Sequence, residues 1–242
     1  MEKLTNREFK QFLKYYDKFN KKVGEISKNE SGESLIEYEF NMYSLDEMCW
    51  DCELLEKYTP KTVDALCYKE SLDNKITLYL VEFKFHNFND PNAKDMLAIM
   101  ADDVNNSNYD EKFNCLTPKF KKNMKKINKY YGDEVEFSLI LKPIESLNVV
   151  IPALYDQYCI DKNIEDKKDI RKFLNNIDKK FILFVSHYDE KSNHGETKQQ
   201  CETMDVGLRD NYKRLEMGNI IDYHEIYPSF KFDYFVRSER LI

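Results

Sequence analysis

The chain has 242 residues, a length that suits one domain or one domain with additions, and its 14% aromatic content can fill a complete core. Its formal net charge of −7 disfavours wholesale electrostatic capture of nucleic acid, although a local basic surface remains compatible with it. The chain has only six glycines and six prolines, which argues against collagen-like, repetitive and low-complexity architectures.

The N-terminal residues predict a helix. Thr5 and Glu8 have the spacing of a capping box, in which each side chain bonds to the main-chain N–H of the other residue. Residues 9–16 then place Phe, Leu and Tyr side chains at helical intervals. We expect this helix to end near Gly24, and residues 25–34 to form a loop.

The following segment predicts a strand and a second helix. Residues 36–42 alternate apolar and polar side chains, as a half-buried strand does, although a helix also fits this run. Ser44 and Glu47 repeat the capping-box spacing and predict a helix over about residues 45–57.

The centre of the chain predicts an antiparallel hairpin. Residues 62–69 and 76–85 are rich in apolar, β-branched and aromatic side chains, and residues 71–74 between them are turn formers. The second run is typical of a strand that is buried on both faces. Glu82 and Lys84 lie inside it two residues apart, so both side chains point to the same face. Buried charges are costly unless they are paired, bound to metal or used in chemistry.

The turn sets the register of this hairpin. If Ser71 pairs with Lys75, Asp64 lies across from Glu82 on the same face, whereas a slip of one residue sends it to the opposite face. In the first register two carboxylates and the Lys84 ammonium converge, with the β-carbons of opposed residues about 5 Å apart. Two carboxylates at that spacing can share one hard cation.

This arrangement resembles the PD-(D/E)XK nuclease superfamily over about residues 35–105. Asp64 matches the Asp of the family's first motif, and Glu82-Phe83-Lys84 matches its E-x-K. The first motif is often Pro-Asp, whereas Val63 precedes Asp64 in this chain. An E-x-K inside a hydrophobic strand, after an Asp-bearing strand and a short turn, is more specific than the three residues alone.

The resemblance implies a restriction-endonuclease-like α/β fold, with a mixed central sheet flanked by helices. It also implies Mg²⁺ or Mn²⁺ held by Asp64, Glu82 and the main-chain carbonyl of Phe83, with Lys84 as the catalytic ammonium. The family often adds an acidic residue from a helix ahead of the Asp strand. The candidates on the predicted helix are Glu47, Asp51 and Glu53.

The rest of the chain predicts a single domain. We place its core at about residues 35–186 and a C-terminal extension at about 187–242, in which residues 220–236 predict edge strands. Further helices are expected over about residues 90–105, 117–132 and 167–177, and further strands over 135–141 and 181–185.

Lysines cluster on the predicted helix 117–132, around a stripe of apolar residues. Lysines at such a surface bind phosphates in a generic, salt-sensitive manner, and a solvated helix face is the equal alternative. The candidates for contact with substrate are Lys94, Lys121, Lys122 and Lys125.

The chain carries no signal-peptide core and no apolar run of membrane-spanning length, so we expect a cytoplasmic protein without a membrane span. In that compartment the six cysteines are expected to be free thiols. Cys49 and Cys52 form a C-x-x-C pair on a predicted helix, where a buried face is the default and a metal or redox pair is the alternative.

Two functions remain open. The first is a Mg²⁺-dependent nuclease that cuts phosphodiesters, in DNA rather than RNA, and that is compatible with a homodimer. The second is a catalytically inactive protein with the same fold that binds nucleic acid or a protein partner. A simpler interpretation is that Glu82 and Lys84 form a structural ion pair at the wet end of a strand.

Overall fold

The computed structural model describes residues 2–29, 32–58, 60–84, 138–185 and 209–241. The chain divides into two compact units, Met1–Phe85 with Ile140–Ile242, and His86–Leu139. Apart from residues 138–139, the second unit lies outside the described ranges, as do the predicted helices 90–105 and 117–132. The sheet and the site described below belong to the first unit.

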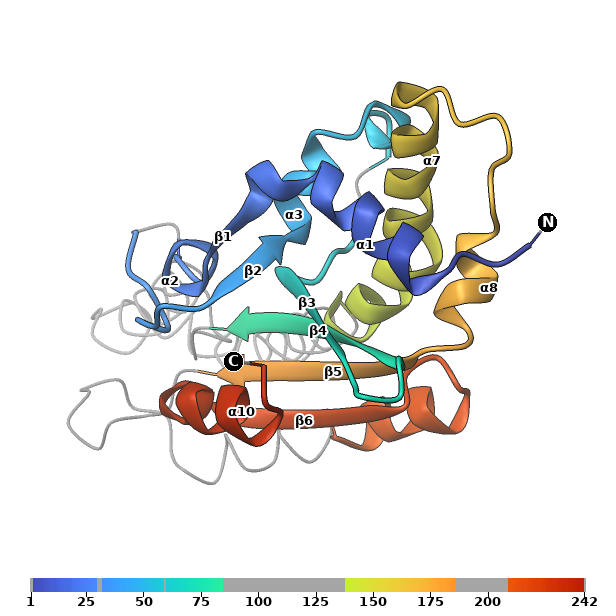
Figure 1. Ribbon diagram of the computed structural model, residues 1–242. Coiled ribbons are helices and arrows are strands. Elements are labelled where there is room, and N and C mark those ends of the chain that lie inside the picture. The colour runs from blue at the N-terminus through green and yellow to red at the C-terminus, as the bar shows by residue number, and fades with distance from the viewer. Residues whose placement is uncertain (1, 30–31, 59, 85–137, 186–208, 242) are drawn as a thin grey trace, which may run out of the picture. The chain divides into compact units, whose positions relative to one another are not determined.

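A mixed six-stranded sheet forms the centre of this unit, with its strands in chain order from β1 to β6 (Figure 1). Neighbours from β1 to β4 are antiparallel, whereas β4, β5 and β6 run parallel to one another. This mixed sheet with helices confirms the predicted α/β class. The strands are β1 (Asn20–Lys22), β2 (Asn41–Ser44), β3 (Ala65–Glu70), β4 (Ile76–Lys84), β5 (Asp178–Val185) and β6 (Tyr223–Pro228).

The central hairpin has the predicted register. Ala65 pairs with Val81, and the antiparallel ladder continues from there to the turn. At the turn, the main-chain N–H of Ser71 donates to the carbonyl of Lys75 at 2.9 Å. Strand β4 is buried along nearly its whole length, as its apolar composition predicts.

The first helix begins as its capping box predicts. Thr5 and Glu8 make both reciprocal hydrogen bonds at the start of α1 (Asn6–Tyr15). The helix ends well before Gly24, because a short 3₁₀-helix, η1 (Asp17–Phe19), turns the chain into the edge strand β1.

The second capping box does not form. Ser44 is the N-cap of α3 (Leu45–Trp50), but its side chain makes no capping hydrogen bond. The Glu47 carboxylate instead binds the Lys21 ammonium of β1 at 2.6 Å. The predicted helix 45–57 is therefore shorter, and it is followed by the 3₁₀-helix η2 (Glu53–Leu55).

A long helix replaces the strand predicted over residues 135–141. Residues 138–145 are helical and continue through the π-helix η3 (Ser146–Val150) into α7 (Ile151–Asp161). The strand prediction is thus wrong for residues 138–141, because an apolar run of this length suits a buried helix as well as a strand. Residues 135–137 lie outside the described ranges.

Within the described ranges, one helix, Ser138–Asp161, has the length and composition of a membrane span. Half of its most apolar 18-residue window is buried inside the protein. A core helix of a soluble protein has the same properties, so this helix is weak grounds for a membrane span.

Helices cover both faces of the sheet (Figure 1). On one face, Phe232 and Phe235 of α10 (Phe232–Ser238) pack against Phe184 of β5. On the other face, Phe9 of α1 packs against Tyr68 of β3, beside α8 (Ile170–Leu174) and α7. Strands alternate their side chains, so Glu82 points to this second face, the side of α1 and α7.

The C-terminal segment confirms one part of its prediction. Residues 223–228 form the edge strand β6, as the pattern over 220–236 indicates, whereas α10 shows that residues 232–236 are helical. Of the six cysteines, the four that the structure describes are buried free thiols, as expected, and they are Cys49, Cys52, Cys67 and Cys159.

Candidate active site

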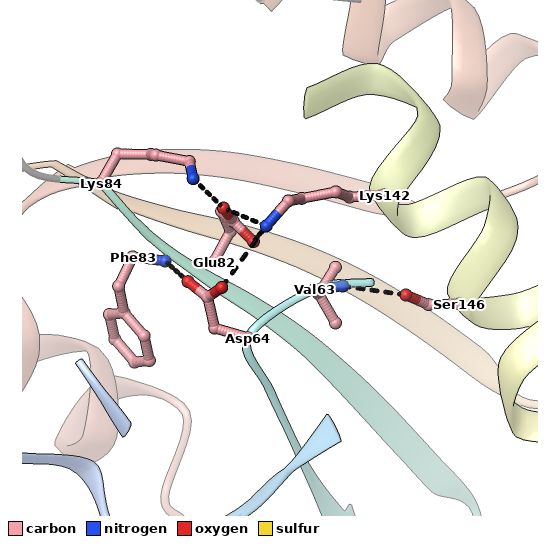
Figure 2. A network of polar contacts seen from close by, with 7 residues as sticks. All are labelled: Val63, Asp64, Glu82, Phe83, Lys84, Lys142 and Ser146. Carbon is pink, nitrogen blue, oxygen red and sulfur yellow. Dashed lines mark hydrogen bonds and ion pairs between the residues drawn. The ribbon is translucent and has the colours of Figure 1, made fainter. Parts of the chain in front are cut away.

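The hairpin brings the predicted carboxylates together. Ala65 pairs with Val81, so the next step along the same register places Asp64 across from Glu82 and on the same face. Figure 2 shows the two carboxylates side by side, with Lys84 reaching over Glu82 from the end of β4. The structure therefore places Asp64, Glu82 and Lys84 at one site.

A main-chain hydrogen bond orients the Asp64 carboxylate. The N–H of Phe83 donates to Asp64 Oδ2 at 2.6 Å, so the carboxylate takes up a donor of β4 just beyond the end of the ladder. The preceding N–H, that of Val63, donates to Ser146 Oγ at 3.0 Å (Figure 2). The other carboxylate oxygen, Oδ1, is left to face the site.

Glu82 and Lys84 form a close pair of unequal exposure. The Lys84 Nζ lies 2.8 Å from Glu82 Oε1, and the side chains are 32% and 0% exposed, respectively. Glu82 is thus a fully buried carboxylate, whereas the ammonium reaches solvent. The simplest interpretation of the sequence was an ion pair at a solvent-exposed strand end. The complete burial of Glu82 does not fit that interpretation.

A second lysine, Lys142, lies between the two carboxylates. Its Nζ is 2.7 and 2.9 Å from the two oxygens of Glu82 and 3.4 Å from Asp64 Oδ1 (Figure 2). Sequence patterns did not indicate this residue, because residues 135–141 resemble a strand. Lys142 and Ser146, four residues apart, lie on the same side of this helix, which faces the hairpin.

A third carboxylate, Asp46, lies near this group. Ser44 pairs with Ala65, and the next N–H, that of Leu45, donates to the carbonyl of Asp64 at 3.0 Å. These contacts hold the first turn of α3 against the start of β3. Asp46 is partly buried there, and the charges of Asp64 and Lys142 both act on it.

The helix carboxyl group on which the charges of the site act is Asp46, which was not among the predicted candidates. Of the three candidates, Glu47 pairs with Lys21, Asp51 pairs with Lys18 at 2.8 Å, and Glu53 lies beyond α3 in η2. Asp46 directly precedes Glu47 in the sequence. Adjacent residues on a helix point about 100° apart, so only one of the two can face the site.

Burial and charge set the protonation of the three carboxyl groups. Burial and the nearby Glu82 charge raise the pKa of Asp64 to about 6. Burial and the Asp64 charge raise the pKa of Asp46 to about 7. Burial also disfavours ionised Glu82, but Lys142 and Lys84 outweigh it and hold the pKa of Glu82 below its ordinary value. Of the three carboxyl groups, Glu82 is therefore the one whose ionised form the site favours.

The Lys142 ammonium stays charged. Burial favours its neutral form, but the carboxylates of Glu82 and Asp64 outweigh burial and raise the pKa of Lys142 above its ordinary value. With Lys84, the site holds two ammonium groups against three carboxyl groups. It is close to electrically neutral when one carboxyl group carries a proton.

An open pocket of about 510 Å³ adjoins the outer side of α3. Asp46 contributes to its wall, and it is also the carboxyl group on which the charges of Asp64 and Glu82 act. Trp50, the only tryptophan of the chain, is 89% exposed there, one helical turn from Asp46. The pocket is lined by Phe19, Asp46, Glu47, Trp50 and Asp51.

The donor set of the site suits Mg²⁺. Asp64 and Glu82 supply hard carboxylate oxygens, and Mg²⁺ is commonly held by one or two carboxylates together with waters and substrate phosphates. Among the described residues, no three His, Cys, Asp or Glu side chains lie close enough to hold a metal ion together. A metal at this site would thus use Asp64 and Glu82, with the main chain or water completing its coordination.

The predicted phosphate-binding residues cannot be placed at this site. They fall outside the described ranges, and they are Lys94, Lys121, Lys122 and Lys125. Comparison of the chain with protein-family models, with curated proteins and with solved structures gives no match.

Proposed function

We propose that this protein is a Mg²⁺- or Mn²⁺-dependent nuclease that hydrolyses phosphodiester bonds, in DNA rather than RNA. The observation that carries the proposal is the register of the central hairpin. It sets the Asp64 and Glu82 carboxylates on adjacent strands of one face, with Lys84 paired to Glu82 at 2.8 Å. This is the arrangement that the resemblance to PD-(D/E)XK nucleases implies.

The order of the elements supports the same proposal. The acidic helix α3 precedes the Asp-bearing strand β3, the E-x-K strand β4 follows antiparallel, and a helix then leads to the parallel strand β5. A restriction-endonuclease-like core combines a helix, an antiparallel hairpin, a second helix and a further strand in this way. We therefore propose that fold for the sheet and its helices.

Each residue has a role that its position supports. Asp64 and Glu82 would hold the metal ion, which supplies charge stabilisation at the scissile phosphate and a nucleophilic water. The N–H and C=O of a strand residue point to the same side, so the Phe83 carbonyl is expected on the Asp64 side. Lys84, which reaches solvent from its pair with Glu82, would orient the attacking water or bind the phosphate.

Asp46 adds a group that can exchange a proton. Its pKa of about 7, which burial and the Asp64 charge produce, leaves it partly protonated near neutral pH. A carboxyl group with such a pKa can accept or donate a proton at physiological pH. It opens onto the pocket beside Trp50, from which a substrate can approach.

One observation favours the second function, an inactive nuclease fold that binds nucleic acid or protein. The Lys142 ammonium already compensates the two carboxylates, at 2.7 Å from Glu82 and 3.4 Å from Asp64. A permanent ammonium at that point would satisfy the site without any metal ion.

A cleavage assay separates the two functions. The full chain is incubated with plasmid, linear duplex, single-stranded DNA and RNA, each with Mg²⁺ or Mn²⁺. The nuclease predicts metal-dependent cleavage that Asp64→Asn and Lys84→Ala abolish while both variants remain folded. Lys75→Ala, at the exposed turn of the same hairpin, is the matched control and should cleave like the wild type. Binding without cleavage would establish the second function, and cleavage that survives Asp64→Asn would contradict the proposed site.

A further inference from the structure

We infer that Lys142 is a built-in competitor of the metal ion. Its ammonium holds the position between Asp64 and Glu82 that a divalent cation would take, so the cation binds only when the ammonium leaves. The inference rests on the proposed function, and it adds a regulatory contact to that site.

The distances make the two cations mutually exclusive. Lys142 Nζ lies 2.7 and 2.9 Å from the Glu82 oxygens and 3.4 Å from Asp64 Oδ1. A Mg²⁺ ion bound to the same oxygens would lie about 2.1 Å from each of them. An ion within that reach of both carboxylates would overlap the ammonium group.

The other oxygens of the two carboxylates also have partners. Asp64 Oδ2 is occupied by the N–H of Phe83 at 2.6 Å. Glu82 Oε1 contacts both Lys84 and Lys142, and Glu82 Oε2 contacts Lys142. The oxygens that face the space between the two carboxylates are thus those that Lys142 contacts.

The helix that carries Lys142 is docked onto the hairpin next to the site. Ser146, four residues along, accepts the Val63 N–H at 3.0 Å and is completely buried. Glu145 accepts the N–H of Lys61 at 2.5 Å. Both contacts are made by residues just before Asp64. They therefore fix the position of the helix relative to the Asp64 carboxylate. The ammonium is therefore placed by the fold rather than by chance on the surface.

The two lysines of the site differ in a way that assigns the competition to Lys142. Lys84 contacts one oxygen of Glu82 from the strand and is 32% exposed, whereas Lys142 contacts both oxygens and is 12% exposed. The Lys142 ammonium and a divalent metal ion compete for the same carboxylates, so their interactions with the site are coupled. Removing the ammonium should therefore strengthen binding of the metal ion.

Calorimetric titration of the full chain with Mn²⁺ tests this coupling. Lys142→Met keeps the aliphatic stem and removes the charge, and it should bind Mn²⁺ at least about tenfold more tightly than the wild type. Lys142→Arg retains the charge and should resemble the wild type. Lys180→Met is the matched control, because Lys180 makes the same two-oxygen contact, at 2.9 and 2.9 Å, with Glu239. Equal or weaker binding by Lys142→Met would overturn the inference.

Acylation of the wild-type chain gives a second measurement that needs no variant. An amine-reactive reagent should modify Lys142 slowly without metal, because its ammonium is paired and 12% exposed. Saturating Mn²⁺ should increase its modification rate several-fold, as mass spectrometry of the peptides would show, while Lys180 is unaffected. A rate that is unchanged or lower with Mn²⁺ would contradict displacement, even if Lys142→Met failed to fold.

The outcomes separate the inference from the proposed function. If wild type and Lys142→Met bind Mn²⁺ equally and cleave, the nuclease stands and the competition is wrong. If neither protein binds Mn²⁺ or cleaves, both proposals are wrong.

Discussion

The main-chain N–H of Phe83 donates to Asp64 Oδ2 at 2.6 Å, so the middle residue of E-x-K orients the carboxylate of the opposite strand. Two parts of the site that come from different strands are thereby coupled through one hydrogen bond. The position of Asp64 depends on its acceptor oxygen, and its chemistry depends on its charge. These two properties can be separated by substitution.

Asp64→Asn should keep the fold and lose the chemistry. Asn retains an acceptor for the Phe83 N–H, so we expect a free energy of unfolding within about 1 kcal/mol of the wild type. Loss of the ligand charge should lower metal-dependent cleavage by at least about 100-fold. Asp64→Ala removes the acceptor too, and should cost about 1–3 kcal/mol in denaturant unfolding. Equal stability of the two variants would show that the hydrogen bond is unimportant.

The stability of the metal-free protein should fall as the pH rises from about 4 to 7. The pKa of Asp46 is raised to about 7 and that of Asp64 to about 6, both from 3.8, chiefly by burial. In this window the folded chain keeps protons that the unfolded chain has lost, so the free energy of unfolding decreases by at most about 1.4 kcal/mol per pH unit for each group. The lowered pKa of Glu82 acts in the opposite direction, below its ordinary value of 4.5.

Denaturant unfolding across this pH range measures the effect. Asp46→Asn should flatten the upper part of the fall, between pH 6 and 7, because Asp46 is the group that titrates there. A profile for Asp46→Asn that matches the wild type would mean that Asp46 titrates as it does in the unfolded chain.

Ser146→Ala should destabilise the docking of the helix onto the hairpin. It leaves the buried Val63 N–H without its 3.0 Å acceptor, which typically costs about 1–3 kcal/mol. Asn148→Ala, at an exposed position of the same helix, is the control and should change the free energy of unfolding by less than about 0.5 kcal/mol. Equal losses for the two variants in urea unfolding would contradict a specific contribution of the hydrogen bond between Val63 and Ser146.

Glu239→Gln should weaken the protein without touching the site. Glu239 accepts hydrogen bonds from Tyr79 Oη at 2.7 Å and from Lys180 Nζ at 2.9 Å. Removing its charge leaves a partly buried ammonium without its partner, and we expect a loss of about 1–3 kcal/mol. Cleavage and Mn²⁺ affinity below the unfolding temperature should be unchanged. A drop in either would mean that losses in site variants reflect stability.

The hairpin could be predicted because its information is local. The turn formers between Ser71 and Lys75 fix the register, and the two-residue period of a strand then carries it to Asp64 and Glu82. Burial of a charged pair in an apolar run marks the site without any knowledge of the rest of the fold. The same local reasoning gave α1, where a capping box is complete within four residues.

Lys142 and Asp46 could not be predicted, for reasons of distance and competition. Lys142 meets Glu82 across 60 positions, and its helix begins in an apolar run that fits either kind of element. Asp46 was not considered because the adjacent Glu47 has the spacing of a capping residue after Ser44 and drew the prediction instead. Glu47 binds Lys21 of β1 instead, a partner that only the folded sheet provides. Tertiary contacts decided both positions.

The π-helix η3 (Ser146–Val150) changes the rotation between the two parts of one continuous helix, so that each part turns a different side to its neighbours. Ahead of it Lys142 contacts the carboxylates. Behind it the Leu154 carbonyl accepts a hydrogen bond from the Tyr16 hydroxyl, and Tyr155 packs against Phe12 of α1. A single deletion within those five residues would restore an α-helical turn and swing Lys142 by about 100° around the axis. The extra residue therefore sets the rotation of the helix that aims Lys142 at the site, and a chain without it is expected to lose the ammonium from the carboxylates.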